Sequence, residues 1–276
     1  MELLMLCPRA GAVLGKPAVL LQGPNGRKAL VVADLHIGWE STLAEKGFHI
    51  PAQVGKMYRA LEELLKAFEP DVLVFLGDVK HTVAGAEAEE WAQIPAFFKA
   101  LLDLTNRIVI VPGNHDGRIE TLLPDGVELS SSGGMKLWEF GLFHGHAWPD
   151  PHLLTCETLI TGHMHPVVSF REGPFFRTTM RVWLVASCDG PCLAKELKKR
   201  GRGIPEEPSA ERLIVMPSFN EFLGGQAINV RKRGASDEKL IGPVLRTRCV
   251  SLASAEVYML DGTFLGKLES LRKVLR

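Results

Sequence analysis

Five short segments of this 276-residue chain contain histidine, and three of them also contain aspartate or asparagine, all side chains that bind transition metals. In chain order they are ADLH (33–36), GDVKH (77–81), GNHD (113–116), FHGH (143–146) and GHMH (162–165). A single histidine is more often a structural residue than a ligand, but five such clusters together indicate a site for two metal ions. Carboxylate oxygens and imidazole nitrogens in one ligand set suit manganese, iron or zinc.

The clusters follow apolar runs that have the character of buried strands. The predicted ligands that follow such runs are Asp34, Asp78, Asn114, His144 and His163. Because open α/β sheets place their sites at the carboxyl ends of strands, segments far apart in sequence can converge there. Asp34 and His36 can reach one ion together, and the two oxygens of Asp78 can bridge two ions.

The elements that must position these residues alternate between strand and helix in the first half of the chain. Residues 18–22 and 28–33 predict a hairpin around Asn25 and Gly26. Residues 71–76 and 107–111 are almost continuously apolar, as strands buried on both faces are.

Helices are predicted between these strands. Apolar residues at helical spacing indicate a helix over residues 53–68. A second helix, over about residues 86–104, is expected to be interrupted at Pro95.

From Met135 onward the pattern changes to strand-like runs separated by turns. These runs cover residues 135–143, 157–161, 179–187, 212–216, 248–252 and 256–260. We therefore expect a sandwich of two sheets with helices outside, the second sheet being mainly antiparallel. It should form a single domain over residues 1–276, with an exposed insertion around residues 188–210.

Composition sets broader bounds. The formal net charge of zero argues against a uniformly basic nucleic-acid binder, although residues 188–210 and 231–237 are basic enough to contact phosphate. No apolar run approaches the length of a membrane span, and the N-terminal residues lack a secretory signal, so we expect a cytoplasmic protein. The five cysteines are too sparse for a disulfide scaffold, and Cys188 and Cys192 are expected to be reduced thiols.

In this order the clusters resemble the signature of the calcineurin-like metallophosphoesterase superfamily, over about Val31 to Pro166. The resemblance implies an α/β fold, a four-layer αββα sandwich of two mixed β-sheets flanked by helices. It also implies a hydrolytic centre with two divalent metal ions. One ion would be held by Asp34, His36 and His165, the other by Asn114, His144 and His163, with Asp78 bridging them.

A centre of this kind hydrolyses phosphate esters through in-line attack by a hydroxide shared between two cations. His115 matches the superfamily's catalytic histidine, which faces the substrate instead of binding metal. An imidazolium at this position can protonate the leaving alkoxide, and we expect the adjacent Asp116 to keep it charged and oriented.

Two further histidines require separate assignments. His81 resembles the position that SbcD-type DNA repair nucleases use to contact the substrate phosphate, so we assign it as a second catalytic residue; a surface loop residue is the alternative. His144 is chosen as the ligand over His146 because it lies directly at a strand end. His146 is then expected on the substrate side or behind the ligands.

GDVKH and the late segment MPSFNEFLGGQAIN (216–229) together resemble a branch of small SbcD-related phosphoesterases. Bacterial members are associated with DNA ligase or helicase operons, which implies such a repair partner and manganese as the metal. Iron, zinc or nickel would also suit the ligands. Phe219, Asn220, Gly224 and Gly225 are expected to form a turn at the site edge.

The leading functional hypothesis is a phosphodiesterase or nuclease that acts on DNA or other nucleic acid. The alternative is a phosphatase or phosphodiesterase of nucleotides or other small phosphate esters, favoured by the zero net charge and by the little room for a capping domain after GHMH. A non-enzymatic scaffold is a third possibility, which the presence of His115 and all seven presumed ligands opposes.

Overall fold

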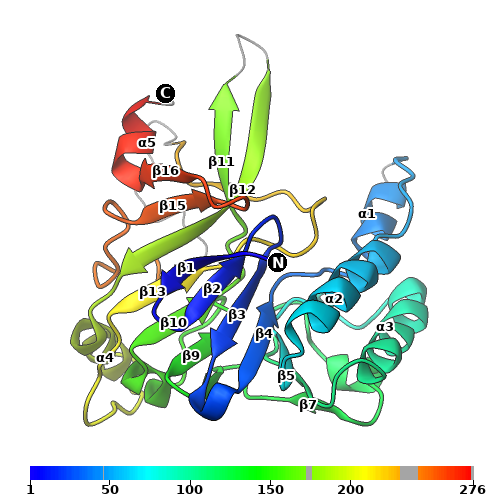
Figure 1. Ribbon diagram of the computed structural model, residues 1–276, viewed down its shortest axis with the longest axis horizontal. Coiled ribbons are helices and arrows are strands. Elements are labelled where there is room, and N and C mark those ends of the chain that lie inside the picture. The colour runs from blue at the N-terminus through cyan, green and yellow to red at the C-terminus, as the bar shows by residue number, and fades with distance from the viewer. Residues whose placement is uncertain (46, 172–175, 231–241, 275–276) are drawn as a thin grey trace.

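The computed structural model describes residues 1–45, 47–171, 176–230 and 242–274 as two β-sheets packed face to face, with helices on their outer faces (Figure 1). In the first sheet the strands lie in chain order: β1 (Leu3–Cys7), β2 (Ala10–Val13), β3 (Ala18–Gln22), β4 (Lys28–Val32), β5 (Val72–Phe75), β6 (Ile108–Ile110) and β7 (Val127–Leu129). Strands β1 to β4 pair antiparallel and β4 to β7 pair parallel. The predicted hairpin joins β3 and β4 and is confirmed.

The second sheet has the order β14-β11-β12-β13-β10-β9-β8, with β15 and β16 paired beside β12. Its strands are β8 (Met135–Leu137), β9 (Phe140–Phe143), β10 (Thr158–Thr161), β11 (Pro166–Arg171), β12 (Arg177–Ser187), β13 (Arg212–Val215), β14 (Gln226–Ala227), β15 (Glu256–Met259) and β16 (Phe264–Lys267). Strands β9, β10 and β13 are parallel, as are β11 and β14, whereas the other pairs are antiparallel. Both sheets are therefore mixed, as the family resemblance implied.

Three apolar clusters separate the four layers. Within β4, Val31 points into the cluster between the sheets, where it joins Trp183 and Ile214, while Leu30 points toward the helices on the other face. The fully buried Trp183 is the largest side chain of the inter-sheet cluster. Because β4 is buried on both faces, its sequence KALVV is apolar beyond the first residue.

Helices α2 (Val54–Phe68) and α3 (Ala88–Leu102) cover the first sheet. Helix α2 confirms the predicted helical spacing. The predicted interruption of α3 at Pro95 is wrong, because the helix continues through this residue. Burial of Ile94, Phe97 and Phe98 on either side of the proline offsets the loss of one backbone hydrogen bond.

The outer face of the second sheet is covered by α4 (Gly190–Lys198) and α5 (Leu268–Val274), and the short α1 (Trp39–Glu45) follows β4. Within residues 188–210, α4 buries Leu193 and Leu197 in the outer core, whereas most of residues 199–209 are exposed. The basic residues 231–237 lie outside the described residues. None of the helices among the described residues is long and apolar enough to cross a membrane.

Three other features differ from the sequence analysis. Strands β1 and β2 form an N-terminal hairpin around Pro8 and Arg9 that was not predicted. The strand expected over residues 248–252 is reduced to a single bridge, Cys188 to Val250. Cys192 is not a reduced thiol, because it forms a disulfide with Cys249, 57 residues away, while Cys188 is free. Spacing alone does not reveal such a distant pairing.

Replacing Cys192 by Ser should lower the free energy of unfolding by about 2–4 kcal/mol, because the bond restricts a long loop of the unfolded chain. Denaturant unfolding under non-reducing conditions measures this change. The control Cys188→Ser alters a half-buried free thiol and should cost less than about 1 kcal/mol. Equal stability of the wild type and Cys192→Ser would contradict the disulfide.

Candidate metal centre and active site

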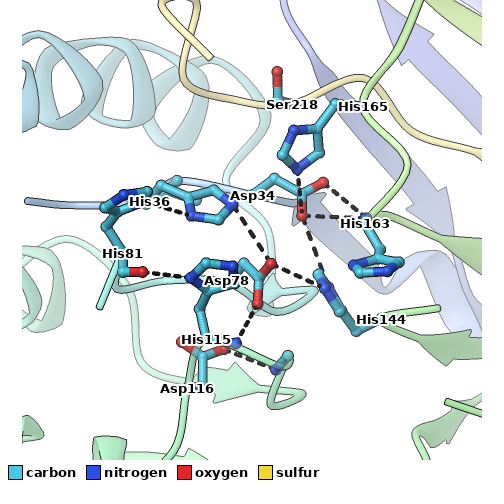
Figure 2. A network of polar contacts seen from close by, with 12 residues as sticks. Asp34, His36, Asp78, His81, His115, Asp116, His144, His163, His165 and Ser218 are labelled. Carbon is cyan, nitrogen blue, oxygen red and sulfur yellow. Dashed lines mark hydrogen bonds and ion pairs between the residues drawn. The ribbon is translucent and has the colours of Figure 1, made fainter. Parts of the chain in front are cut away.

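The predicted ligands come from the loops that follow strands of both sheets, and these loops meet at one edge of the sandwich (Figure 2). Parallel pairing of β4, β5 and β6, and of β9 and β10, directs their carboxyl ends to that edge. The folded chain thus brings together Asp34, His36, Asp78, His144, His163 and His165.

One ligand group consists of Asp34, His36 and His165, whose ligand atoms lie within 4.8 Å of one another. The Oδ1 atom of Asp34 is 3.2 Å from Nε2 of His165. Asp34 is completely buried, so its charge requires a cation or hydrogen-bond donors close by. This is the set that the family resemblance assigned to the first ion.

The second group consists of Asp78, His144 and His163, again within 4.8 Å. The Oδ2 atom of Asp78 is 3.2 Å from Nε2 of His144 and 3.4 Å from Nε2 of His36. Asp78 therefore lies between the two groups, where a bridging carboxylate must be. This position agrees with its predicted role.

The imidazoles are oriented for metal binding. Nδ1 of His144 contacts the carbonyl oxygen of Leu76 at 2.8 Å, and Nδ1 of His165 lies 3.4 Å from that of Gly224. A carbonyl oxygen can only accept, so Nδ1 carries a proton and Nε2 is the nitrogen that can bind a cation. Among the described residues, the buried Nε2 atoms of His36, His144 and His165 form no hydrogen bond of good geometry, and they lie 3.2–3.4 Å from the carboxylates of Asp34 and Asp78. The site therefore fits divalent cations.

The pKa values follow from burial and from the two carboxylates. Burial lowers the pKa of His36 to about 3 and that of His163 to about 4, so both rings are neutral at pH 7, as ligation requires. Burial also disfavours the charged form of His144, but Asp78 and Asp34 outweigh it and raise its pKa to about 9. In the metal-free protein, a proton on His144 thus offsets part of the buried negative charge.

Asn114 lies in the loop after β6 and is exposed. The next residue, His115, donates its backbone N–H to Oδ1 of Asp78 at 2.9 Å. A Cβ atom at Gly113 would lie only 2.2 Å from this Oδ1 atom of Asp78. The glycine of GNHD therefore lets this loop approach Asp78.

His115 and His81 lie beside His36 rather than among the ligands of the second group (Figure 2). Their rings are stacked with centroids 5.6 Å apart, and Nδ1 of His115 contacts the carbonyl oxygen of His81. Because this oxygen accepts a hydrogen bond from Nδ1–H, Nε2 of His115 remains available for a substrate. Nδ1 of His81 is 3.3 Å from Nδ1 of His36.

Asp116 does not orient the His115 ring as expected. Its Oδ1 accepts the backbone N–H groups of Val79 and Lys80 at 2.9 and 3.2 Å, and its Oδ2 accepts that of Gly113 at 2.8 Å. Burial and the charge of Asp78 raise its pKa to about 6. Asp116 therefore joins the GDVKH and GNHD loops, and the carbonyl of His81, not Asp116, contacts the ring of His115.

The comparisons with known proteins agree with this geometry. The calcineurin-like phosphoesterase family matches residues 27–176, which contain every predicted ligand. The chain belongs to this family. Among solved structures, it is similar to the nuclease MPE of Pseudomonas putida, with a TM-score of 0.57 and 19% identity over 94% of this chain and 96% of that one.

A second similar structure is Yfce, a phosphoesterase from E. coli, with a TM-score of 0.32 and 20% identity over 52% of this chain and 74% of that one. No curated protein matches the chain in sequence. The family assignment thus rests on the match over residues 27–176, and the P. putida structure supports the fold over nearly the whole length.

His146 lies beside two of the ligands of this phosphoesterase centre. Its ring centroid is 5.4 Å from that of His144 and 6.1 Å from that of His163. Burial and the neighbouring charge of His144 lower its pKa. His146 thus lies next to the second ligand group, and Nδ1 of this half-buried ring has no hydrogen-bond partner within the described residues.

Among the residues that support the phosphoesterase site, Asn220 was expected from the sequence at the site edge, whereas Lys80 and Glu90 were not expected in a supporting role. Asn220 donates from Nδ2 to the carbonyl oxygen of Leu35 at 3.0 Å, which confirms that the segment after β13 borders the site. Lys80, within GDVKH, and Glu90, which accepts the N–H of His81, are both buried. Burial of a Lys or Glu cannot be predicted from one sequence. The glycines of GD, GN and GH, in contrast, could have indicated close packing of the loops around the site.

Replacing Gly113 by Ala should reduce metal occupancy at least about tenfold, because the new methyl group must displace Asp78. Metal analysis after dialysis against manganese measures the occupancy. The matched control is Gly55→Ala on α2, where a Cβ atom meets nothing closer than 4.0 Å. Full occupancy in Gly113→Ala would show that this close approach is not needed.

Metal binding at pH 7 should release about one proton or more per protein, because His144 must lose its proton to become a ligand. Apparent affinity should therefore rise as pH increases toward 9. Calorimetric titration in two buffers with different ionisation enthalpies counts the protons. Equal heats in both buffers would contradict a protonated His144.

Proposed function

We propose that this centre hydrolyses phosphodiester bonds of nucleic acid with two divalent ions, of which manganese is the expected metal. Bound cations supply Lewis-acid activation of water and of the phosphoryl oxygens. The residues that would hold them are Asp34, His36 and His165 on one side and Asn114, His144 and His163 on the other, with Asp78 between. Such a site needs no covalent intermediate with the protein.

The proton for the leaving oxygen comes from His115 in this proposal. With Nδ1 held by the carbonyl of His81, a second proton on Nε2 points away from that contact and can pass to the leaving alkoxide. The ring centroid of His115 lies 4.7 Å from that of His36, so the proton donor stands beside the first ligand group.

An aromatic surface beside the first ligand group is the observation that supports nucleic acid as substrate. Phe222 is 43% exposed, and its ring centroid lies 6.5 Å from that of Trp39. Trp39 donates its backbone N–H to the carbonyl of His36 at 3.1 Å, and Phe222 donates its own to Oδ1 of Asn220 at 3.1 Å. Bases of single strands stack on such rings without sequence preference.

Two further points agree with the proposal. Nζ of Lys56 lies 5.8 Å from the ring centroid of Phe222 and pairs with Glu221, so a phosphate between stacked bases could meet it by displacing that carboxylate. The P. putida protein that shares this fold is a nuclease. The assignment to the SbcD-related branch, a DNA ligase or helicase partner and a cytoplasmic location stay predictions from the sequence.

A small phosphodiester or nucleotide is the second candidate substrate. The formal net charge of zero gives this protein no long-range attraction for a polyanion. Salt distinguishes the candidates, because a nuclease that neutralises several phosphates loses affinity steeply with ionic strength.

The proposal is tested by adding manganese to metal-free protein with single-stranded DNA or with bis(p-nitrophenyl) phosphate. Phe222→Ala should raise the KM for DNA by roughly 5- to 150-fold, since one stacked base contributes about 1–3 kcal/mol, and leave the KM for the small diester unaffected. The control Phe264→Ala removes a ring that is 53% exposed on β16. Rapid hydrolysis of the small diester with no DNA cleavage would replace the nuclease proposal with the second candidate.

A further inference from the structure

Glu90 is a buried carboxylate, 1% exposed, that belongs to neither ligand group. It lies in the first turn of α3, where its Oε2 accepts the backbone N–H of Glu87 at 2.9 Å. Its Oε1 accepts two more N–H groups, from His81 at 2.9 Å and from Thr82 at 2.7 Å. The carboxylate thus anchors the end of the GDVKH loop to a helix.

His81, which Glu90 anchors, is also the residue that contacts the ring of His115. The carbonyl oxygen of His81 contacts Nδ1 of His115, while the N–H of the same residue binds Glu90. The N–H of His81 also donates to the carbonyl oxygen of Ile37 at 3.0 Å. The next N–H along the chain, that of Thr82, donates to Glu90. The peptide between His81 and Thr82 therefore binds Glu90 through its N–H and His115 through its C=O.

Close packing leaves Glu90 little freedom to move. Gly38, with a φ of +94°, passes so near that a Cβ atom there would lie 2.8 Å from Cγ of Glu90. The loop that carries His36 and the loop that carries His81 therefore both rest against this side chain. A charged acceptor for two N–H groups forms stronger hydrogen bonds than a neutral amide does.

We propose that Glu90 is a positioning residue for His115. Through the His81–Thr82 peptide it fixes the carbonyl that selects the Nδ1–H tautomer of His115 and aims Nε2 at the leaving oxygen. Glu90 itself contacts neither substrate nor metal. The inference rests on the proposed function, in which His115 gives its proton to the leaving alkoxide.

The test compares two diesters that differ in their need for that proton. The leaving group of a thymidine dinucleotide is an alkoxide, which requires protonation. The leaving group of bis(p-nitrophenyl) phosphate is p-nitrophenolate, which scarcely needs it. His115→Ala should lower kcat for the dinucleotide by about 10²–10⁴-fold and for the nitrophenyl ester by far less. Glu90→Gln should show the same selectivity with a smaller loss, about 10- to 100-fold, at unchanged KM and metal content.

Glu89→Gln is the matched control, because Glu89 is exposed in the same helical turn and accepts a hydrogen bond from Oγ of Ser41. It should retain wild-type kcat on both esters. In the double variant, His115→Ala combined with Glu90→Gln, kcat for the dinucleotide should fall no further than in His115→Ala alone.

The outcomes separate the two ideas. If His115→Ala slows both esters equally, the leaving-group role in the proposed function is wrong. If His115→Ala is selective but Glu90→Gln slows both esters equally, or neither, the positioning role is overturned. Should Glu90→Gln lose its metal, Glu90→Asp, which keeps the charge, replaces it, and an equal loss on both esters there also overturns the inference.

Discussion

The burial of Asp34 and Asp78 is the constraint on which the rest of this structure depends. Their exposed fractions are 0% and 2%, and an ionised carboxylate removed from water is costly unless donors or cations surround it. Backbone N–H groups satisfy part of this need: His163 donates to both oxygens of Asp34, and His115 donates to Asp78. The remaining negative charge favours the binding of cations at the site.

The loops that surround these two carboxylates have an uncommon backbone conformation. Five predicted ligands have left-handed φ values between 45° and 66°: Asp34, His36, Asp78, His163 and His165. Such residues cost about 1–3 kcal/mol each unless their surroundings hold them. The loops hold one another, since the N–H of Asp34 donates to the carbonyl of Gly77 at 3.0 Å and that of His36 to the carbonyl of Asp78 at 2.9 Å. Each strand-end loop is therefore stable only in the presence of the next.

Patterns that depend on near neighbours could be predicted from the sequence, and those that depend on distant contacts could not. The β3–β4 hairpin and helix α2 follow from local spacing, and the ligand clusters follow from residue type. The predicted interruption at Pro95 was wrong because burial of α3 against the sheet outweighs the local free-energy cost of proline. The Cys192–Cys249 bond depends on how α4 docks, which no short segment encodes.

The carboxylates show the same limit within the site itself. Asp34, Asp78, Asp116 and Glu90 are all buried, but the first two face the metal-binding imidazoles and the last two bind only backbone N–H groups in the described structure. Residue type cannot distinguish these roles, because a carboxylate serves equally as ligand or as loop anchor. The division matters for chemistry: the facing pair sets where cations bind, and the anchoring pair sets where the loops, and with them His115, stand relative to those cations.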